Sequence, residues 1–420
     1  MKLRLSKFGE KLCASTGILE LMDDLGNALS GDRKMLMLGG GNPAAIPEVQ
    51  AIWRARMTEI MADGTLMDQV LVNYDTPQGR PKFIHALVDF INRHYGWNIG
   101  PDNIAITNGS QNAFFYLFNM LAGEFPDGTN GKILLPLAPE YIGYADQGLN
   151  ASLFTARRPC IEIIDQHTFK YHIDFDALDL TDDITAICVS RPTNPSGNVL
   201  TDEEIEQLSA IAKARGIPLL IDNAYGVPFP GILFKDTQPI WDEHIIFSLS
   251  LSKLGLPGTR TGIVIAAPEI AQALSNANAV ASLANGNLGQ ELVAPLLEDD
   301  RIIELSQGMI RPFYQEKSRR AQEILKAALD DDLPYYLHAS EGALFLWLWC
   351  KDLPITSKEL YKRLKDRGVV VVSGHYFFYG LDEDYPQRNE CIRINYSQSE
   401  EVVSEGLQII AEEVTRAYRE

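Results

Sequence analysis

The sequence predicts an α/β protein, with a mostly parallel central sheet covered by helices on both faces and a smaller α+β domain. Three observations carry this prediction. Short apolar runs without alternation recur through the middle of the chain, which is typical of strands buried on both faces. Helical patterns separate these runs. After about residue 300 the order of the elements changes.

Six apolar runs are the expected strands of the central sheet. Between the third and the fourth, residues 201–216 predict a helix, because Thr201 and Glu204 form a capping box and Gly216 is a stop signal. A strand, a helix and a strand in this order form a βαβ unit, so these strands should run parallel. The runs are IAIT (104–107), ILLP (133–136), AICVS (186–190), PLLID (218–222), IIFSLS (245–250) and GIVIAA (262–267).

The last quarter of the chain predicts a smaller α+β domain. A chain of 420 residues is too long for a single compact core. We therefore expect a large domain over 46–305, and a small domain formed by 1–45 together with 306–420. Its expected elements are a long helix (311–329), a strand (343–349), a helix (356–368), two short strands (369–373 and 391–396) and a final helix (400–419).

Composition and charge exclude several classes of partner. The formal net charge is −19, so nucleic acid and anionic membrane are not expected partners. The five cysteines are scattered and the seven histidines are dispersed, so neither a disulfide framework nor a metal site is expected. The basic N-terminus lacks the apolar core of a signal peptide, and no apolar run is long enough to span a bilayer. We expect a cytoplasmic protein.

Polar residues follow the first expected strand. Gly109, Ser110 and Gln111 would open a helix after IAIT, and the free N–H groups at such a start suit a phosphate. An ordinary turn with Ser110 as N-cap is the alternative. Asn194 follows AICVS between turn-forming residues, where an Asx turn would also explain it.

Two later strands end on charged residues. Asp222 ends PLLID, where a carboxylate is costly unless a cation faces it, although it could instead cap the next segment. Lys253 follows IIFSLS, and burial there would lower its pKa and leave a nucleophilic amine. Ser250 and Arg260 flank it as possible anion binders. The alternatives are a solvated Lys253 and a surface ion pair for Arg260.

Together these residues match the requirements of one ligand, pyridoxal 5′-phosphate. Ligands bind at the carboxyl ends of parallel strands, which is where these residues fall. The phosphate of this cofactor needs N–H groups and an arginine, and its aldehyde needs a lysine. Its pyridine nitrogen needs a carboxylate, and its phenolate oxygen needs hydrogen-bond donors.

At these motifs the sequence resembles the fold-type I pyridoxal-phosphate enzymes, the aspartate aminotransferase superfamily. The resemblance covers essentially the whole chain, and it implies that fold. The matching segments are GGGNP (39–43), YDTPQG (74–79), TNGSQNA (107–113), PEYIGY (139–144), SRPTNPSGN (190–198), DNAY (222–225), SLSKLGLPGTRTG (250–262) and CIRIN (391–395).

The resemblance implies a role for each residue that matches the family pattern. Lys253 would bond covalently to the cofactor aldehyde and move a proton between the substrate Cα and cofactor C4′. Asp222 would pair with the pyridinium nitrogen. Tyr225 and Asn194 would bond the phenolate oxygen. These are the residues implied at the reacting end of the cofactor.

Further residues are implied to hold the phosphate, the ring and the substrate. Tyr141 would stack on the ring, and Tyr74 would reach the phosphate bound by a neighbouring subunit, which implies a homodimer with shared sites. Arg393 would clamp the substrate α-carboxylate, helped by backbone near Gly41. The lysine-to-arginine interval is seven residues, where relatives commonly show eight, so the turn LGLPG should be one residue tighter. The implied phosphate ligands are Gly109, Ser110, Gln111, Ser250 and Arg260.

This set implies transamination between amino acids and 2-oxo acids, with the carboxylate held by Arg393 and the proton moved by Lys253. Between Arg260 and Arg301 the chain has no Lys or Arg, and 276–290 reads NANAVASLANGNLGQ. A small neutral side chain such as that of valine or alanine suits this stretch better than aspartate. The aromatic residues 376–379 are expected either to line the side-chain pocket or to pack as a loop.

Other functions stay open at this point. On the same scaffold, an aromatic or general amino-acid aminotransferase and a carbon–sulfur lyase use similar residues. A transcription regulator with an aminotransferase-like domain would need a DNA-binding domain before it, normally about 70 residues long. The substrate-loop motif already begins at Gly39 and the chain is acidic, so we do not expect this class.

Overall fold

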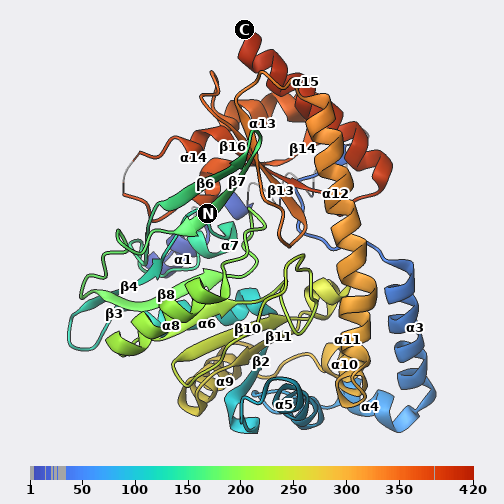
Figure 1. The fold of residues 1–420 in the computed structure, drawn as a ribbon. Coiled ribbons are helices and arrows are strands. Elements are labelled where there is room, and N and C mark those ends of the chain that lie inside the picture. Colours follow the sequence, from blue (N-terminus) through green and yellow to red (C-terminus); the bar gives the residue numbers. More distant parts are fainter. Residues whose placement is uncertain (1–3, 15, 20–21, 23–25, 27–34, 383) are drawn as a thin grey trace.

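The computed structural model describes residues 4–14, 16–19, 22, 26, 35–382 and 384–420. Figure 1 shows two parts, one above the other: the lower contains the central sheet, and the upper contains most of the orange and red C-terminal segments. Within the described residues, no helix has the length and apolar character that crossing a membrane requires.

The large sheet has eight strands, in the order β2-β11-β10-β9-β8-β4-β3, with β5 beside β4. Their registers show that all of them except β11 and β3 run in the same direction. All six predicted runs are strands of this sheet. The bounds are β2 (Ile104–Thr107), β3 (Gly123–Glu124), β4 (Asn130–Leu135), β5 (Phe154–Ala156), β8 (Ile184–Ser190), β9 (Leu219–Asp222), β10 (Ile245–Ser250) and β11 (Gly262–Ile265).

Helices cover the large sheet. Every residue of β9, β10 and β11 is buried, which requires cover on both faces because successive side chains point to opposite sides. The predicted helix after AICVS begins at its Thr201–Glu204 capping box and ends at Gly216, whose φ is 67°. The helices around this sheet are α3 (Pro47–Ala62), α4 (Gly64–Val72), α5 (Pro81–Tyr95), α6 (Ser110–Leu121), α7 (Ile142–Ala145), α8 (Asp202–Arg215), α9 (Pro268–Ser282) and α10 (Leu288–Glu298).

The second sheet has six strands, in the order β15-β16-β13-β12-β7-β6. The hairpin β6–β7 comes from residues 159–173, inside the range 46–305, yet its strands join this sheet through β12. Sequence reasoning did not anticipate this exchange of a hairpin. The bounds are β6 (Pro159–Asp165), β7 (Thr168–Ile173), β12 (Tyr335–His338), β13 (Phe345–Cys350), β15 (Val372–Ser373) and β16 (Cys391–Asn395).

The run VVVVS (369–373), predicted as one strand, is divided between two sheets. β14 (Val369–Val370) pairs in parallel with β1 (Leu36–Met37), whereas β15 pairs with β16. The N-terminal segment 36–41 is therefore held beside the C-terminal part of the chain. The helices of this part are α12 (Arg311–Ala328), α13 (Ser357–Asp366), α14 (Gln387–Glu390) and α15 (Glu400–Arg419); α1 (Lys7–Leu12) and α11 (Arg301–Ile303) are short.

Candidate active site

The carboxyl ends of the central strands meet at one edge of the large sheet. Ser190 at the end of β8 pairs with Asp222 at the end of β9, and Gly262 at the start of β11 pairs with Thr107 at the end of β2. Because β11 runs opposite to its neighbours, its first residues lie at this same edge. Arg260 therefore comes to the edge from the beginning of a strand, and the other polar groups come from strand ends.

A cavity of about 760 Å³ opens at this edge, between the large sheet and the second sheet. It collects nearly all of the residues that the sequence analysis selected. Tyr74 lies elsewhere, with 81% of its surface exposed. Gly109 lies under the side chain of Arg260. The predicted residues that line the cavity are Gly41, Ser110, Gln111, Tyr141, Asn194, Asp222, Tyr225, Ser250, Lys253, Arg260 and Arg393.

The start of α6 and the Arg260 guanidinium form a cationic corner of the cavity. Gly109 has φ 90°, and a Cβ there would lie 2.0 Å from Arg260 Nη2. A Cβ on Gly262 would lie 2.5 Å from the main-chain nitrogen of Ser110. The two glycines thus let the guanidinium and β11 approach the helix start, where free N–H groups favour an anion.

The seven-residue interval between Lys253 and Arg260 is accommodated by two 3₁₀ turns. They cover Ser252–Leu254 and Pro257–Thr259, and Gly255 between them has φ 86°. Arg260 itself is left-handed, with φ 48°. This tight path brings the guanidinium back to the cavity.

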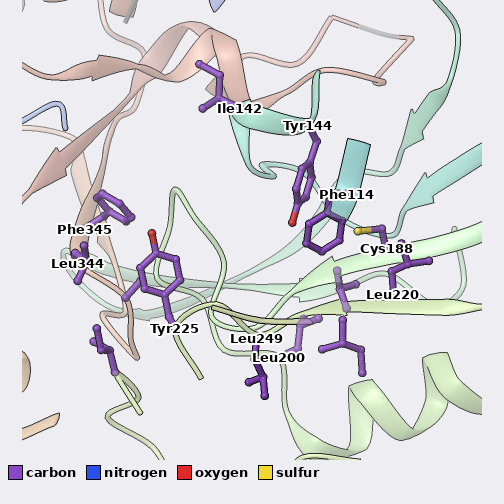
Figure 2. Packing of buried hydrophobic residues seen from close by; sticks show 14 of the residues in the cluster. Phe114, Ile142, Tyr144, Cys188, Leu200, Leu220, Tyr225, Leu249, Leu344 and Phe345 are labelled. Carbon is purple, nitrogen blue, oxygen red and sulfur yellow. The ribbon is translucent and has the colours of Figure 1, made fainter. Parts of the chain in front are cut away.

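Asp222 is the carboxylate of the cavity. Its Oδ1 accepts a hydrogen bond of 3.0 Å from the Ala224 N–H, and its Oδ2 accepts one from the Tyr144 hydroxyl. Burial raises the pKa of Asp222 to about 6, against the lowering effect of the Tyr144 bond. Figure 2 shows Tyr144 standing beside Phe114 and close to Cys188. Tyr144 was not selected from the sequence, although it lies three residues after Tyr141 in PEYIGY.

Lys253 presents its ammonium nitrogen to the N-terminal segment and to a tyrosine ring. The Nζ donates a 2.6 Å hydrogen bond to the Gly41 carbonyl and lies 5.3 Å from the centre of the Tyr225 ring. Burial lowers the pKa of Lys253 to about 8, and the charges of Arg393 and Arg260 act in the same direction. A substantial fraction of this amine is therefore neutral near physiological pH.

Arg393 projects from β16 and is 2% exposed. Its guanidinium carbon lies 4.2 Å from the centre of the Phe345 ring and 5.4 Å from that of Phe377. Nη1 donates to Asn194 Oδ1 at 2.7 Å and Nη2 to the Gly39 carbonyl at 2.6 Å, but the buried Nε has no partner among the described residues. Burial lowers the pKa of Arg393 to about 10.

The cations of the cavity outnumber its carboxylate. Lys253, Arg260 and Arg393 bond to main-chain carbonyls and neutral side chains, and none donates to a carboxylate within the described residues. A cavity with this excess of positive charge is suited to ligands that carry several negative charges. Anionic groups can bind at two separate places. One is the buried Nε of Arg393, which has no partner among the described residues, and the other is the corner formed by the start of α6 and Arg260, which pack closely at Gly109.

These residues fit pyridoxal 5′-phosphate together with an amino acid. The corner at α6 and Arg260 matches a phosphate, Asp222 a ring nitrogen, Lys253 an aldehyde, and Arg393 a substrate carboxylate. The side chain of Gln111 is engaged elsewhere, because its Nε2 donates to the Gly143 carbonyl at 2.8 Å. Only its main-chain N–H, in the first turn of α6, is left for the anion.

Two segments considered for the side-chain pocket do not line the cavity. Of the residues 376–379, Phe377 packs on Arg393, and the Tyr379 hydroxyl donates to the Tyr141 carbonyl at 3.0 Å. Phe377 and Tyr379 therefore pack against residues of the site and do not line the cavity. In the stretch 276–290, Asn278 and Asn285 are buried and both donate to the Pro77 carbonyl. Much of the apolar lining comes from residues that sequence reasoning missed, among them Ile18, Met22, Met37 and Ile142.

Comparisons with known proteins agree with this geometry. The valine–pyruvate aminotransferase of Escherichia coli (strain K12) is 48% identical over 415 residues, which are 99% of each chain. The solved structure of valine–pyruvate aminotransferase from Salmonella typhimurium LT2 is 47% identical, with a TM-score of 0.89, over 96% of this chain and 100% of that one. A mutant of Thermus thermophilus aspartate aminotransferase, 19% identical, has the same fold with a TM-score of 0.78 over 98% of this chain and 100% of its own.

The family model of class I and II aminotransferases matches residues 34–410, which is most of the chain. The chain therefore belongs to the class I and II aminotransferases, enzymes that depend on pyridoxal 5′-phosphate.

Proposed function

We propose that the enzyme transfers the amino group of L-valine to pyruvate, and so forms 3-methyl-2-oxobutanoate and L-alanine. The observation that carries this proposal is the arrangement of Lys253, Asp222 and Arg393 around one cavity. A partly neutral amine, a buried carboxylate and a buried guanidinium are the three groups that amino transfer needs. The names of relatives that are 48% and 47% identical supply the two substrates.

When it is bound, the cofactor supplies an electron sink that makes the Cα–H of an amino acid acidic. Arg393 binds the substrate α-carboxylate and fixes the orientation of that C–H bond. Lys253 would then remove the proton from Cα and return a proton at C4′. Asp222, as a carboxylate, would hold the proton on the ring nitrogen. Tyr225 and Asn194 would donate hydrogen bonds to the phenolate oxygen.

The lining of the cavity favours a substrate with a small neutral side chain. Each cation that lines it in the described part of the chain, namely Lys253, Arg260 and Arg393, already has a role toward the cofactor or the α-carboxylate. No described cation is left for a second carboxylate. The apolar side chains of Ile18, Met22 and Met37 suit an aliphatic group such as the isopropyl group of valine.

An absorption titration of the purified protein tests this function. We expect a yellow band that bleaches on addition of L-valine and returns on addition of pyruvate, and no such cycle with Lys253→Ala. L-Aspartate should bleach the band far less than L-valine. A band that L-valine leaves unchanged would refute the substrates, and the absence of a band with added pyridoxal 5′-phosphate would refute the cofactor.

The homodimer also remains a proposal. Large apolar side chains are exposed in two segments, and Asn287, which follows the second segment, donates to the Asn73 carbonyl at 3.0 Å. Exposed apolar surface is typical of a protein interface. The exposed residues are Leu71, Val72 and Tyr74 in the first segment and Val280 and Leu283 in the second.

Mixing two defective chains tests the shared site. A hybrid of Tyr74→Ala and Lys253→Ala chains contains one site in which both residues are intact. We therefore expect mixing after denaturation and refolding to restore activity that neither chain shows alone. A monomer by sedimentation, or no gain of activity on mixing, would contradict the shared site.

We also place the protein in the cytoplasm. Its five cysteines are free thiols, and Cys13 and Cys160 are exposed. Exposed thiols persist in a reducing compartment. Detection of the native protein in a periplasmic or secreted fraction would contradict this assignment.

A further inference from the structure

Glu140 is a buried carboxylate beside the site that the mechanism above does not use. It is 1% exposed, and no cationic side chain of the described residues neutralises it. Its Oε1 accepts hydrogen bonds of 2.7 Å from the Tyr141 N–H and 2.6 Å from the Ser190 hydroxyl, and its Oε2 accepts one of 3.0 Å from the Ser190 N–H. An unpaired buried carboxylate is costly, so its retention requires a reason.

These bonds join two elements of the candidate site. Tyr141 lines the cavity, and Ser190 is the last residue of β8, paired in register with Asp222. The Glu140 N–H also donates to the Phe377 carbonyl at 2.9 Å. This bond connects the loop of Tyr141 with Phe377, which packs on Arg393 of the second sheet. Glu140 therefore lies where the loop of Tyr141, the end of β8 and the segment of Phe377 meet.

Only a carboxylate can accept all three of these bonds. Glutamine has one acceptor oxygen, and its amide group would bring two more N–H donors against the Ser190 N–H. Burial raises the pKa of Glu140 to about 7, and the charge of Asp222 adds to that rise. The hydrogen bonds from the Ser190 hydroxyl and the Tyr141 N–H oppose this rise and favour the ionised form.

We propose that Glu140 is a positioning residue, which fixes the ring of Tyr141 over the cofactor by fastening the Tyr141 loop to the end of β8. The inference rests on the proposed function, because it assumes that Tyr141 stacks on the cofactor ring. The Tyr141 ring already packs closely on Gly143, since a Cβ on Gly143 would lie 2.3 Å from that ring. Gly143 follows Tyr141 in the chain, and Glu140 precedes it. Glu140 therefore holds the backbone of the loop on the N-terminal side of Tyr141.

Three variants test this role. Glu140→Gln removes the charge and one acceptor, and Ser190→Ala removes one hydrogen bond while Glu140 stays. Glu413→Gln is the matched control, because Glu413 is equally buried but lies in α15 near Arg363 and Arg367. The measurements are the thermal unfolding of each apoprotein, the dissociation constant of pyridoxal 5′-phosphate, and the visible circular dichroism of the bound cofactor, which reports the orientation of its ring.

We expect Glu140→Gln to weaken cofactor binding about tenfold and to reduce the visible circular dichroism, as the loss of a hydrogen bond to a charged group implies. Ser190→Ala should show the same changes to a smaller extent, whereas Glu413→Gln should lower stability alone. Binding and dichroism equal to wild type in Glu140→Gln would overturn the inference. If that variant does not fold, wild-type values in Ser190→Ala would overturn it. Failure of the wild type itself to bind the cofactor would instead refute the proposed function.

Discussion

The lowered pKa of Lys253 makes a quantitative prediction about the reactivity of its amine. Its ordinary value of 10.5 falls to about 8 in the cavity, because the ammonium is buried and Arg393 and Arg260 lie nearby. At pH 8 about half of the Lys253 side chains are then neutral, against roughly 0.3% for an ordinary lysine. The neutral amine is therefore about 150-fold more abundant, and only this form is nucleophilic.

Competitive labelling with a trace of acetic anhydride measures this directly. The acetylation rate of Lys253 in the apoprotein, followed by mass spectrometry from pH 6 to 11, should rise with a midpoint near 8. Lys213 is an internal reference in the same sample, because its hydrogen bond to Asp242 raises its pKa above the ordinary value. The two lysines should thus titrate in well-separated pH ranges.

Two substitutions test the cause as well as the value. Arg393→Gln removes a neighbouring positive charge, so the Lys253 midpoint should move to higher pH. Asp222→Asn removes a negative charge that favours the ammonium, so the midpoint should move lower. A wild-type midpoint near 10, or shifts of the same sign in both variants, would refute this electrostatic account of the lysine.

Three further predictions concern other parts of the site and its support. Gly109→Ala should weaken binding of pyridoxal 5′-phosphate at least tenfold in an equilibrium titration, because the new Cβ meets Arg260 and φ 90° is unfavourable for alanine. Arg393→Lys should raise the KM for both substrates about 100-fold in steady-state kinetics, since an ammonium cannot keep its present bonds and also clamp a carboxylate in a bidentate pair. Asn285→Ala should lower the unfolding free energy by about 1–3 kcal/mol, measured with urea, because the carbonyls of Ile106 and Pro77 lose the hydrogen bonds that Asn285 donates, while Pro77 keeps the one from Asn278.

The fold was predictable where local patterns and burial agree. The run IIFSLS became β10 because an unbroken apolar run is stable only when both faces are covered. The helix at 202–215 formed between the capping box and the glycine that predicted it. The hairpin 159–173 was not predictable in the same way, because its place in the second sheet depends on pairing with β12, more than 160 residues later in the chain.

Site residues could be predicted from the sequence where a charged side chain follows a buried strand, because charge is unusual at that place. Asp222 and Lys253 stand out because charge is costly after a buried strand, and the structure places both in one cavity. Tyr144 and Glu140 gave no such signal. A tyrosine on an apolar helix face and a glutamate in a loop are ordinary in sequence, and their importance comes from what they contact across the fold.

The stretch 276–290 has a structural role that its sequence did not reveal. Its lack of cations suggested a neutral substrate, but its amides serve another purpose: Asn278 and Asn285 donate to the Pro77 carbonyl and Asn287 to the Asn73 carbonyl. They hold the loop that presents Tyr74 outward. A preference for the proposed small neutral substrate would therefore act within this chain through the apolar lining of the cavity.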